Sequence, residues 1–243
     1  MCGRAYETYS DEELNIRYLN QRFPPIPDFL PTYNLCPTHS SPVLRLLDGE
    51  RKFDSMQWQL IPDWEPTFKT KLSTINARSE SVFGSRLFGE LISRKRCIVP
   101  LSGFFEWKPD GKIKRPFRIF LKDEPIMSVA GLWETWHAGR EGERSSFTIL
   151  TTKANSFMSG IHDRMPVILG RDEEDEWLDP EIHEQEPLTR MMKPCPSEWL
   201  TALEVSTLVN SPKNNSPEIL VPASAAPAAK QPLMRSLFDE EAL

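Results

Sequence analysis

The sequence predicts an α+β fold, with a curled mixed, mainly antiparallel β-sheet or a partly closed barrel and a few peripheral helices. Short segments of alternating apolar residues recur along the chain. Turn-forming pairs, Asp48-Gly49 and Asp110-Gly111, separate some of them as hairpin turns do. The helical patterns between them are few and scattered. Many short strands with few helices are typical of an α+β domain with a sheet that curls on itself.

The first part of the chain begins with a capped helix. Ser10 and Glu13 form a capping box ahead of an apolar stripe, which predicts a helix at about residues 11–21. The proline-rich stretch 24–37 predicts an irregular loop. Val43–Leu47 and Lys52–Leu60 predict the two strands of a hairpin, with Trp58 on its core face. A loop over 61–75 and a helix over 87–95 follow.

The second part is predicted to be mostly strands. In a strand over Phe104–Trp107, period-two geometry places Glu106 on one face and Trp107 on the other. Further strands are expected at 116–121, 126–133, 146–152, 165–169 and 200–208, and helices at 172–178 and 188–193. From Pro222 the composition changes to Pro, Ala and Ser. We therefore expect a catalytic domain over 2–222 and a disordered tail over 223–243.

The charge distribution, the apolar runs and the cysteine spacing restrict the kinds of protein that this chain can be. The net charge is −6, yet residues 51–122 hold 15 Lys and Arg against 7 Asp and Glu, which is compatible with a phosphate-binding groove. No apolar run is long enough to cross a membrane, and no apolar leader follows Met1, so we expect a cytoplasmic protein. The four cysteines show neither a Cys-x-x-Cys pair nor zinc-ligand spacing, and none is expected in a disulfide.

Cys2 has a chemistry that depends on its position. Methionine aminopeptidases remove Met1 when the next residue is small, which would make Cys2 the new N-terminus. Its α-amine and thiol would then lie on adjacent carbons, with ordinary pKa values near 8 and 8.5. Such a 1,2-aminothiol captures an aldehyde as a Schiff base and then closes a thiazolidine ring, a step favoured by proximity. The alternative is a cysteine at this position by chance.

Five other positions carry side chains suited to catalysis or nucleic-acid binding. Asn76 and Arg78 share a face if their segment is extended, and they could orient a carbonyl and hold a phosphate. Glu106 lies between aromatic residues, a setting that suits a general acid or base. His162 offers proton transfer near neutral pH. An exposed Trp64 could stack on unpaired bases. Each of these residues, taken alone, has an equally simple structural explanation.

Together and in order, these segments resemble the SRAP family, the SOS response-associated peptidases or abasic site processing proteins. The resemblance covers residues 2–222. The matching segments are Met1-Cys2-Gly3-Arg4, Tyr33-Asn34 with Pro37, Gln57-Trp58-Gln59-Leu60-Ile61-Pro62-Asp63-Trp64, Asn76-Ala77-Arg78-Ser79-Glu80, Arg96-Cys97-Ile98-Val99-Pro100, Gly103-Phe104-Phe105-Glu106-Trp107, Ile161-His162-Asp163-Arg164-Met165-Pro166, and Val209-Asn210 with Asn214-Asn215.

The resemblance implies a role for each catalytic residue. Cys2 is the covalent residue, which crosslinks to abasic sites in single-stranded DNA. Asn76 positions its amine and the open-ring sugar, Glu106 is the general acid/base, and His162 is a second proton-transfer group that also serves reversal. The residues that match DNA-binding positions are Arg4, Asn34, Trp64, Arg78, Arg86 and Arg164. No metal or cofactor is expected.

One position departs from the family pattern. The family commonly has glycine after the tryptophan of its strand, and this chain has Gln59. The departure lies at the start of the backbone path from Trp58 toward Trp64.

Other outcomes remain open from the sequence. β-Elimination of the Schiff base would make the protein an abasic-site lyase, and Met1 could be removed by self-processing. A different class is an N-terminal-nucleophile cysteine hydrolase or peptidase that acts on amide bonds. A third class is a non-catalytic single-strand binding module. In the tail, a loose sliding-clamp-binding spacing comprises Gln231, Met234, Leu237 and Phe238. We expect a monomer with no membrane partner.

Overall fold

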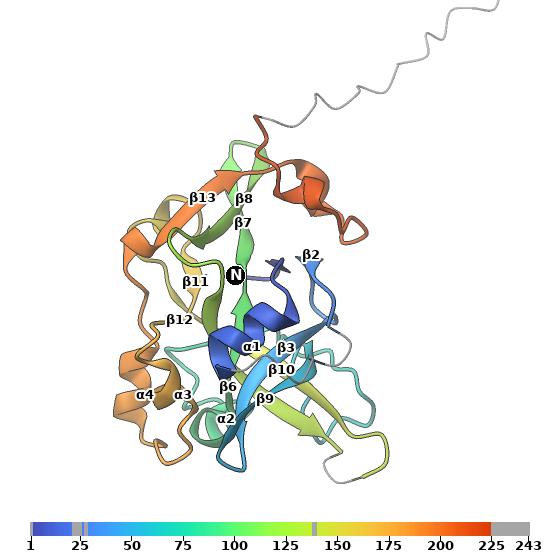
Figure 1. Cartoon of the computed structure of the whole chain (residues 1–243), viewed down its shortest axis with the longest axis vertical. Helices are drawn as coiled ribbons and strands as arrows, with labels where there is room; N and C mark the ends of the chain where they lie inside the picture. Colours follow the sequence, from blue (N-terminus) through green and yellow to red (C-terminus); the bar gives the residue numbers. More distant parts are fainter. Residues whose placement is uncertain (1, 21–25, 27–28, 138–139, 225–243) are drawn as a thin grey trace, which may run out of the picture.

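A computed structural model of the chain describes residues 2–20, 26, 29–137 and 140–224. Its strands form two sheets, which Figure 1 shows one above the other. The upper, small sheet has the order β13-β8-β7-β1-β2. Its strands are β1 (Ala5–Glu7), β2 (Thr32–Leu35), β7 (Gly103–Asp110), β8 (Ile113–Leu121) and β13 (Leu200–Glu204). All of the pairings within it are antiparallel, as the sequence predicts for most of the fold.

The lower sheet closes into a barrel. Its main path runs β10-β4-β3-β6-β9, and β9 pairs back onto β10, so that these five strands have no free edge between them. They are β3 (Ser40–Leu47), β4 (Glu50–Trp58), β6 (Arg96–Leu101), β9 (Met127–Trp136) and β10 (Arg144–Lys153). The predicted barrel-like α+β architecture is therefore confirmed.

Three short strands extend the barrel where β9 and β10 diverge. They are β5 (Asn76–Arg78), β11 (Arg164–Pro166) and β12 (Ile168–Leu169). β5 runs parallel to β10, β11 runs antiparallel to it, and β12 pairs with β9. The predicted strand over 165–169 is thus wrong as one element, because the chain passes from β10 to β9 at Val167, whose backbone bonds both.

Helices cover one side of the barrel strands. The α-helices among the described residues are α1 (Asp11–Leu19), α2 (Gly89–Arg94), α3 (Glu174–Leu178) and α4 (Gln185–Met191). They bury apolar residues, such as Tyr18, Ile92 and Trp177, against outward-facing strand residues that include Ile98 and Leu132. No helix in the described part of the chain is long and apolar enough to cross a membrane.

The alternate residues of the same strands face the small sheet. Trp58, Val99 and Phe147 form a core there with Cys2 and Phe104. The next residue of β7, Phe105, points to the far side of the small sheet and joins a separate cluster with Tyr6 and Val209. Strand alternation therefore divides the molecule into distinct cores, and it sends Cys2 into the one between the two sheets.

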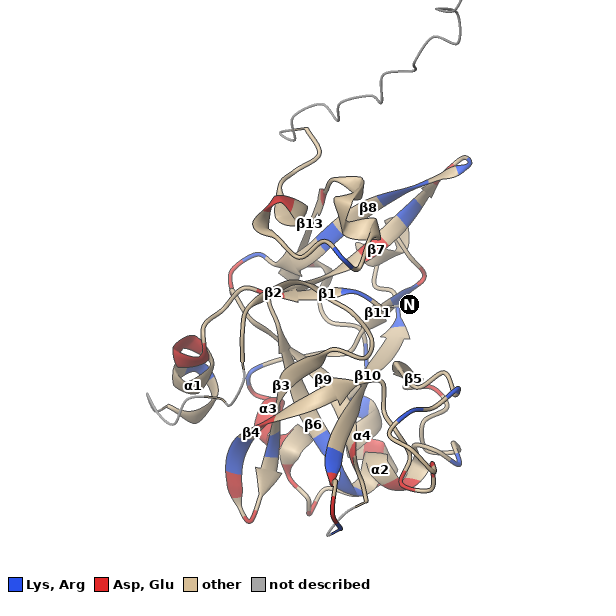
Figure 2. Cartoon of the chain, turned by 90° about the vertical axis from the view of Figure 1, so that its right-hand side faces the viewer, with Lys and Arg blue, Asp and Glu red and all other residues tan. Residues whose placement is uncertain are grey.

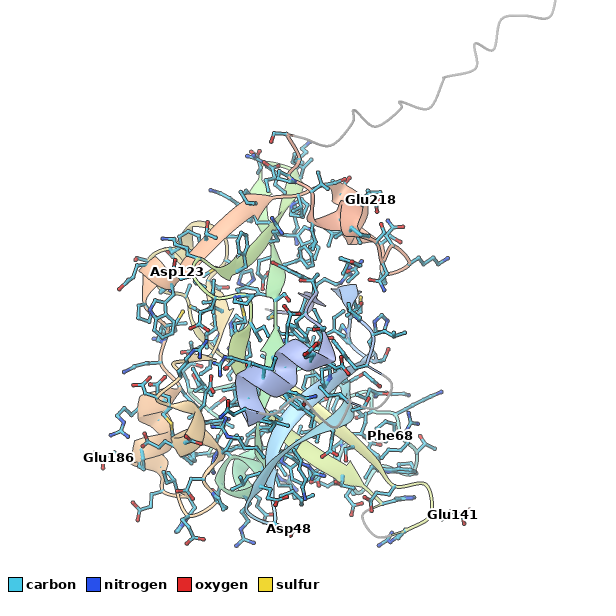
Figure 3. The ribbon with its side chains drawn as sticks, viewed as in Figure 1. Asp48, Phe68, Asp123, Glu141, Glu186 and Glu218 are labelled. Atoms are coloured by element: carbon cyan, nitrogen blue, oxygen red, sulfur yellow. The ribbon has the colours of Figure 1, made fainter. Side chains whose placement is uncertain are left out.

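Local sequence signals explain several elements. The capping box is present as predicted, with the Ser10 side chain accepting from the Glu13 backbone N–H and the Glu13 carboxylate accepting from the Ser10 backbone N–H. At the β3–β4 turn, Asp48 and Gly49 both have positive φ, 51° and 79°. A two-residue hairpin turn of this type needs positive φ at both positions. Figure 3 shows Asp48 at the far lower end of the molecule, where this hairpin turns.

Two predicted stretches differ from the structure. The region 24–37 was expected to be a loop throughout, but its last part is β2, which pairs with β1. The strand expected over 200–208 ends at Glu204, because the Ser206 side chain caps a 3₁₀-helix, η3 (Thr207–Asn210). A further 3₁₀-helix, η4 (Pro217–Leu220), follows it.

The last described residues still contact the small sheet. Ala223 donates its backbone N–H to the carbonyl of Glu204. The remainder of the tail, 225–243, lies outside the described residues. The clamp-like positions Gln231, Met234, Leu237 and Phe238 belong to that part.

Candidate active site

Pairing of distant strands brings the N-terminus to β7. Ala5 pairs with Phe104, and Arg4 accepts a hydrogen bond from the backbone N–H of Phe105. On the barrel side, β5 and β11 both join β10 at Thr151, which pairs with Arg78 and with Pro166. Cys2, Asn76, Glu106 and His162 are the four predicted catalytic residues, and these pairings direct their segments to the region between the two sheets.

Asn76 contacts Cys2 directly. Its side-chain Nδ2 donates to the backbone carbonyl of Cys2 at 2.8 Å. The residue before Asn76 is fixed by Trp58, whose Nε1 donates to the Ile75 carbonyl at 2.9 Å. The Oδ1 of Asn76 is buried and accepts no hydrogen bond in the described part of the structure. The Asn76 amide therefore binds the Cys2 carbonyl through Nδ2, while Oδ1 is still available as an acceptor. Such an acceptor suits a side chain that must also bind an amine or a hydroxyl.

Glu106 and His162 form the second contact of the site. Glu106 is 4% exposed, and its Oε2 lies 4.0 Å from Nε2 of His162. Nδ1 of His162 lies 3.0 Å from the backbone N–H of Arg164 and also 3.0 Å from Oδ1 of Asp163. A backbone N–H can only donate and a carboxylate can only accept, so these two contacts favour opposite tautomers of the ring. The other ring nitrogen, Nε2, faces the Glu106 carboxylate.

The Cys2 side chain is fully buried in the chain that still carries Met1. Burial, and after it the nearby Glu106 carboxylate, raise the pKa of the Cys2 thiol well above its ordinary value. The sequence led us to expect reactive fractions of both the amine and the thiolate at neutral pH. In the chain that still carries Met1, these surroundings instead favour the protonated thiol.

The predicted DNA-binding residues divide into two groups. Trp64 is 68% exposed, and Arg78 and Arg86 are exposed as well, so these three are available to a ligand. Arg164 is buried instead, and its guanidinium binds the Glu80 carboxylate at 2.6 Å and the Thr151 carbonyl at 2.7 Å. These contacts fix β11, the strand that follows His162, against β10. Arg164 therefore belongs to the second group, whose side chains are engaged within the protein.

Arg4 and Asn34 belong to the second group. Asn34 is fully buried, and its amide bridges Arg4 to the loop after η3 through the carbonyls of Ser211 and Asn214. Arg4 also donates to the carbonyl of Val209 and lies over the Trp107 ring, 5.8 Å from its centroid. These two residues hold the C-terminal segment against the small sheet. The Arg4 backbone also hydrogen-bonds the Cys2 thiol, so its main chain reaches the predicted catalytic residues while its side chain binds the C-terminal segment.

The 209–215 segment has a structural role that the sequence alone did not reveal. Asn210 accepts from Trp107 Nε1 at 2.8 Å, and Asn215 accepts from the Tyr33 backbone N–H at 2.7 Å. The partners are more than a hundred residues apart in the chain, so no local pattern signals the contacts.

Gln59 has a positive φ, a backbone conformation that glycine adopts easily. Its φ is 100°, a region that residues with a Cβ rarely enter. Its backbone N–H donates to the Phe147 carbonyl at 3.0 Å, and Trp58 beside it is buried and stacks on the Phe147 ring. The Gln59 backbone is therefore anchored to β10 at the start of the chain path toward Trp64.

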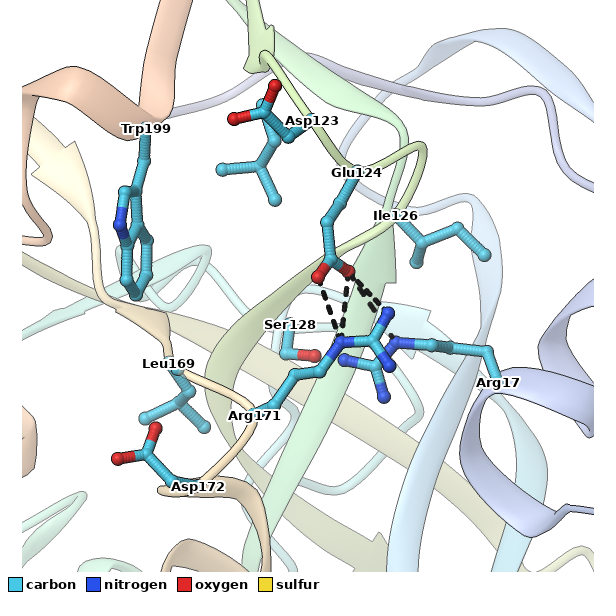
Figure 4. Close-up of a pocket in the computed structure, with 11 residues that line it drawn as sticks. Arg17, Asp123, Glu124, Ile126, Ser128, Leu169, Arg171, Asp172 and Trp199 are labelled. Carbon is cyan, nitrogen blue, oxygen red and sulfur yellow. Dashed lines mark hydrogen bonds and ion pairs between the residues drawn. The ribbon is translucent and has the colours of Figure 1, made fainter.

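A cavity of about 330 Å³ lies elsewhere on the molecule. Figure 4 shows Arg17, Glu124, Arg171 and Trp199 around it. The Arg171 guanidinium donates to Glu124 at 2.7 Å, and Arg17 lies 3.9 Å from the same carboxylate. Arg17, Glu124 and Arg171 thus lie together there, and none of the four predicted catalytic residues lines the cavity. In the described part of the chain, no three His, Cys, Asp or Glu side chains gather as metal ligands would.

Comparisons with known proteins identify relatives of the whole domain. A family model described as SOS response associated peptidase (SRAP) matches residues 1–212. Abasic site processing protein YoqW of Bacillus subtilis is 39% identical over 227 residues, which cover 90% of this chain and 99% of the relative. Abasic site processing protein HMCES of Xenopus tropicalis is 32% identical, over 90% of this chain and 78% of its own length. A crystal structure of a protein from Bacteroides thetaiotaomicron superposes with a TM-score of 0.76 at 29% identity, over 90% of this chain and 99% of that one.

Proposed function

Because the chain belongs to the SOS response-associated peptidase (SRAP) family, we propose that it processes abasic sites in single-stranded DNA by bonding to them through Cys2. The observation that carries the proposal is the contact of the Asn76 amide with the Cys2 backbone, with the Glu106–His162 pair close by. Relatives named abasic site processing proteins, matched over most of this chain, support the choice of substrate.

The reaction begins once Met1 is removed, by an aminopeptidase or by self-processing. An abasic deoxyribose exists partly as an open-chain aldehyde. The Cys2 α-amine adds to the aldehyde carbon, and loss of one water gives the Schiff base. The sulfur then bonds to the same carbon, and the thiol proton passes to the imine nitrogen. Ring closure needs no further leaving group, so the thiazolidine adduct equals protein plus DNA less one water.

The pKa of the Cys2 thiol is raised in the chain that still carries Met1, and we infer that the same surroundings order these two steps once Met1 is removed. A protonated sulfur is a weak nucleophile, whereas the α-amine retains a reactive fraction at neutral pH. The amine therefore attacks first. Formation of the Schiff base places a basic nitrogen beside the thiol, and this nitrogen can accept the thiol proton as the ring closes. Proximity makes the second step fast in spite of the unfavourable pKa.

The surrounding side chains take matching roles. Glu106 exchanges protons with the sugar oxygen as the ring opens, and it protonates the hydroxyl that departs as water. His162 Nε2 in turn exchanges protons with Glu106. The unused Oδ1 of Asn76 accepts a hydrogen bond from the new α-amine or from a sugar hydroxyl. Reversal of the adduct uses the same groups. If the Schiff base undergoes β-elimination instead, the site acts as an abasic-site lyase.

The DNA strand is held by two sets of residues. Arg78, Arg86 and Trp64 contact phosphates and bases directly, because they are exposed. Arg4, Asn34 and Arg164 act from within the protein, and they contact DNA only if their present hydrogen bonds are exchanged for phosphate. We further propose a monomer that works on DNA in the cytoplasm without a metal or cofactor.

A crosslinking assay tests the proposal. Protein shown by mass spectrometry to lack Met1 is incubated with single-stranded DNA that contains one abasic site, and the mixture is resolved on a denaturing gel. We expect a protein–DNA band with abasic DNA and none with intact DNA. A Cys2→Ser control keeps the amine but not the thiol, so its adduct should survive only after borohydride reduction. If the protein gives no band, the covalent function is wrong and peptide and amide substrates become the next test.

A further inference from the structure

The outer part of the β7–β8 hairpin, beyond Glu106, carries positively charged side chains without ion-pair partners among the described residues. It comprises residues 108–115, the outer ends of β7 and β8, and we call it the basic arm. Figure 2 shows it projecting from the body of the molecule, with Lys and Arg along both strands and at the tip. Its basic residues are Lys108, Lys112, Lys114 and Arg115, and its acidic residue is Asp110.

Three of these cations have no partner in the described part of the chain. Arg115 is neutralised, because it binds Glu204 of β13 and lies 3.7 Å from Asp110. Lys108, Lys112 and Lys114 are exposed and make no ion pair or hydrogen bond with other described side chains. A hairpin with three solvated lysines and an exposed Ile113, at 63%, gains little stability from those side chains.

The root of the arm lies in the active site. Glu106 is buried, and Lys108 is the next residue of β7 on the same face. Residues two apart in a strand are separated by about 7 Å, so the lysine follows the catalytic carboxylate at that spacing. The turn at Gly111 lies on the order of 17 Å beyond Glu106 by the same measure. A strand of DNA whose abasic sugar lies at Glu106 would therefore pass the arm within a few nucleotides.

We propose that the basic arm binds the phosphates of the DNA strand flanking the abasic site. This inference rests on the proposed function and extends it, because the arm supplies contacts outside the set Arg4, Asn34, Trp64, Arg78, Arg86 and Arg164. Lysine acts on phosphate as a mobile point charge, which suits contacts that hold DNA without reading its sequence. An acidic protein partner would need the same charges, but the continuity of the arm with Glu106 favours the substrate strand.

Binding to two lengths of undamaged single-stranded DNA tests the arm separately from the chemistry. The arm variant is Lys108→Gln, Lys112→Gln and Lys114→Gln. The matched control is Lys52→Gln, Lys122→Gln and Lys193→Gln, which removes the same charge from exposed positions outside the arm. Affinity is measured by fluorescence anisotropy from 50 to 200 mM salt, on an oligonucleotide of about five nucleotides and on one of about twenty.

We expect the arm variant to bind the long strand on the order of tenfold more weakly at low salt, with a salt slope reduced by about 2, since each phosphate contact on a single strand contributes about 0.7. Binding to the short strand should stay within about twofold of the unaltered protein. Equal losses in the arm and control variants would show general charge attraction and overturn the proposal, as would an arm variant that binds both strands normally.

The crosslinking function and the arm can fail independently. If Cys2 forms no adduct but the arm variant loses affinity for the long strand, the arm remains a DNA-binding surface and the covalent function is wrong. If the adduct forms and the arm variant binds the long strand normally, the arm proposal is wrong. Loss of affinity only for an acidic protein, with DNA binding unchanged, would also overturn it.

Discussion

The side chain of Asn76 donates a hydrogen bond to the backbone carbonyl of Cys2 at 2.8 Å, and so ties strand β5 of the barrel to the beginning of the chain. The two residues are brought together by strand pairings that are remote in sequence. The carbonyl carbon of Cys2 is bonded to the Cα that bears the amine, and the thiol follows on the adjacent Cβ. Its orientation therefore sets where both nucleophiles point.

Asn76→Asp should slow crosslinking by about 10- to 100-fold. The new carboxylate presents only acceptors to the Cys2 carbonyl, and loss of one hydrogen bond in a buried site costs about 1–3 kcal/mol. Single-turnover kinetics with abasic DNA would measure the change. Binding to undamaged DNA, as the control, should not change. A crosslinking rate within twofold of the unaltered protein would mean that the contact does not position Cys2.

Glu106→Gln should slow reaction with abasic DNA by about 10² to 10⁴, the range that general acid–base groups contribute. The carboxylate raises the pKa of the Cys2 thiol, so its removal favours the thiolate and cannot weaken the sulfur. Capture of a small open-chain aldehyde by the same variant separates the steps, because that reaction needs no opening of a sugar. We expect capture to slow much less. Equal losses with both aldehydes would contradict the proposed role in opening the sugar.

Elements with local signals could be predicted from the sequence, and those without could not. The α1 cap depends on residues three apart, Ser10 and Glu13, and the β3–β4 turn depends on Asp48-Gly49. β1 and β2 were missed because each is only three or four residues long. Pairing with β7 at Phe104 stabilises the first of them, and that contact is almost a hundred residues away.

The candidate site likewise has features that the local sequence predicts and features that depend on distant contacts. Period-two reasoning placed Glu106 and Trp107 on opposite faces, and their different burial agrees. No pattern in the sequence brings Asn76 to Cys2 or predicts the environment that raises the pKa of its thiol. The family resemblance supplied the set of residues. The structure was needed to show that Asn34 and Arg164 are already engaged by the protein.

Gln59→Gly should stabilise the protein by about 0.5–1 kcal/mol. A residue with a Cβ at φ 100° is strained by about 1–2 kcal/mol, which exceeds the entropy that a glycine loses on folding. Urea unfolding would give the difference. The same substitution at Gln57, within β4 and at ordinary φ, should destabilise the protein instead. If both glycine variants were destabilised alike, the positive φ at Gln59 would not be a source of strain.

Glu7→Gln should change how stability depends on pH. Burial raises the pKa of Glu7 to about 8, although hydrogen bonds from Ser41 and Tyr9 oppose the shift. The folded protein therefore keeps this proton up to about pH 8, whereas the unfolded chain releases it near pH 4.5. The stability contributed by the proton is complete below pH 4.5 and is lost as pH rises to about 8. The amide has no proton to lose.

The measurement is the free energy of unfolding of both proteins at pH 4 and pH 9. At pH 4 the Glu7 side chain is neutral in the folded protein and mostly neutral in the unfolded chain, so near-equal stability serves as the control. At pH 9 the glutamine variant should be the more stable, by on the order of 2–4 kcal/mol. A difference between the two proteins that stays constant with pH would show that Glu7 does not titrate in this range.

Trp64 and Trp58 should give opposite results when each is replaced by alanine. Trp64 is 68% exposed and Trp58 is fully buried. Trp64→Ala should leave the melting temperature unchanged and weaken single-stranded DNA binding by about 1–3 kcal/mol, which is the loss of one stacked base. Trp58→Ala should destabilise the fold by about 3–5 kcal/mol, because it leaves a cavity against Phe147. Normal DNA affinity in the Trp64 variant would show that this exposed ring faces solvent only, and would place the bound strand along Arg78 and Arg86 alone.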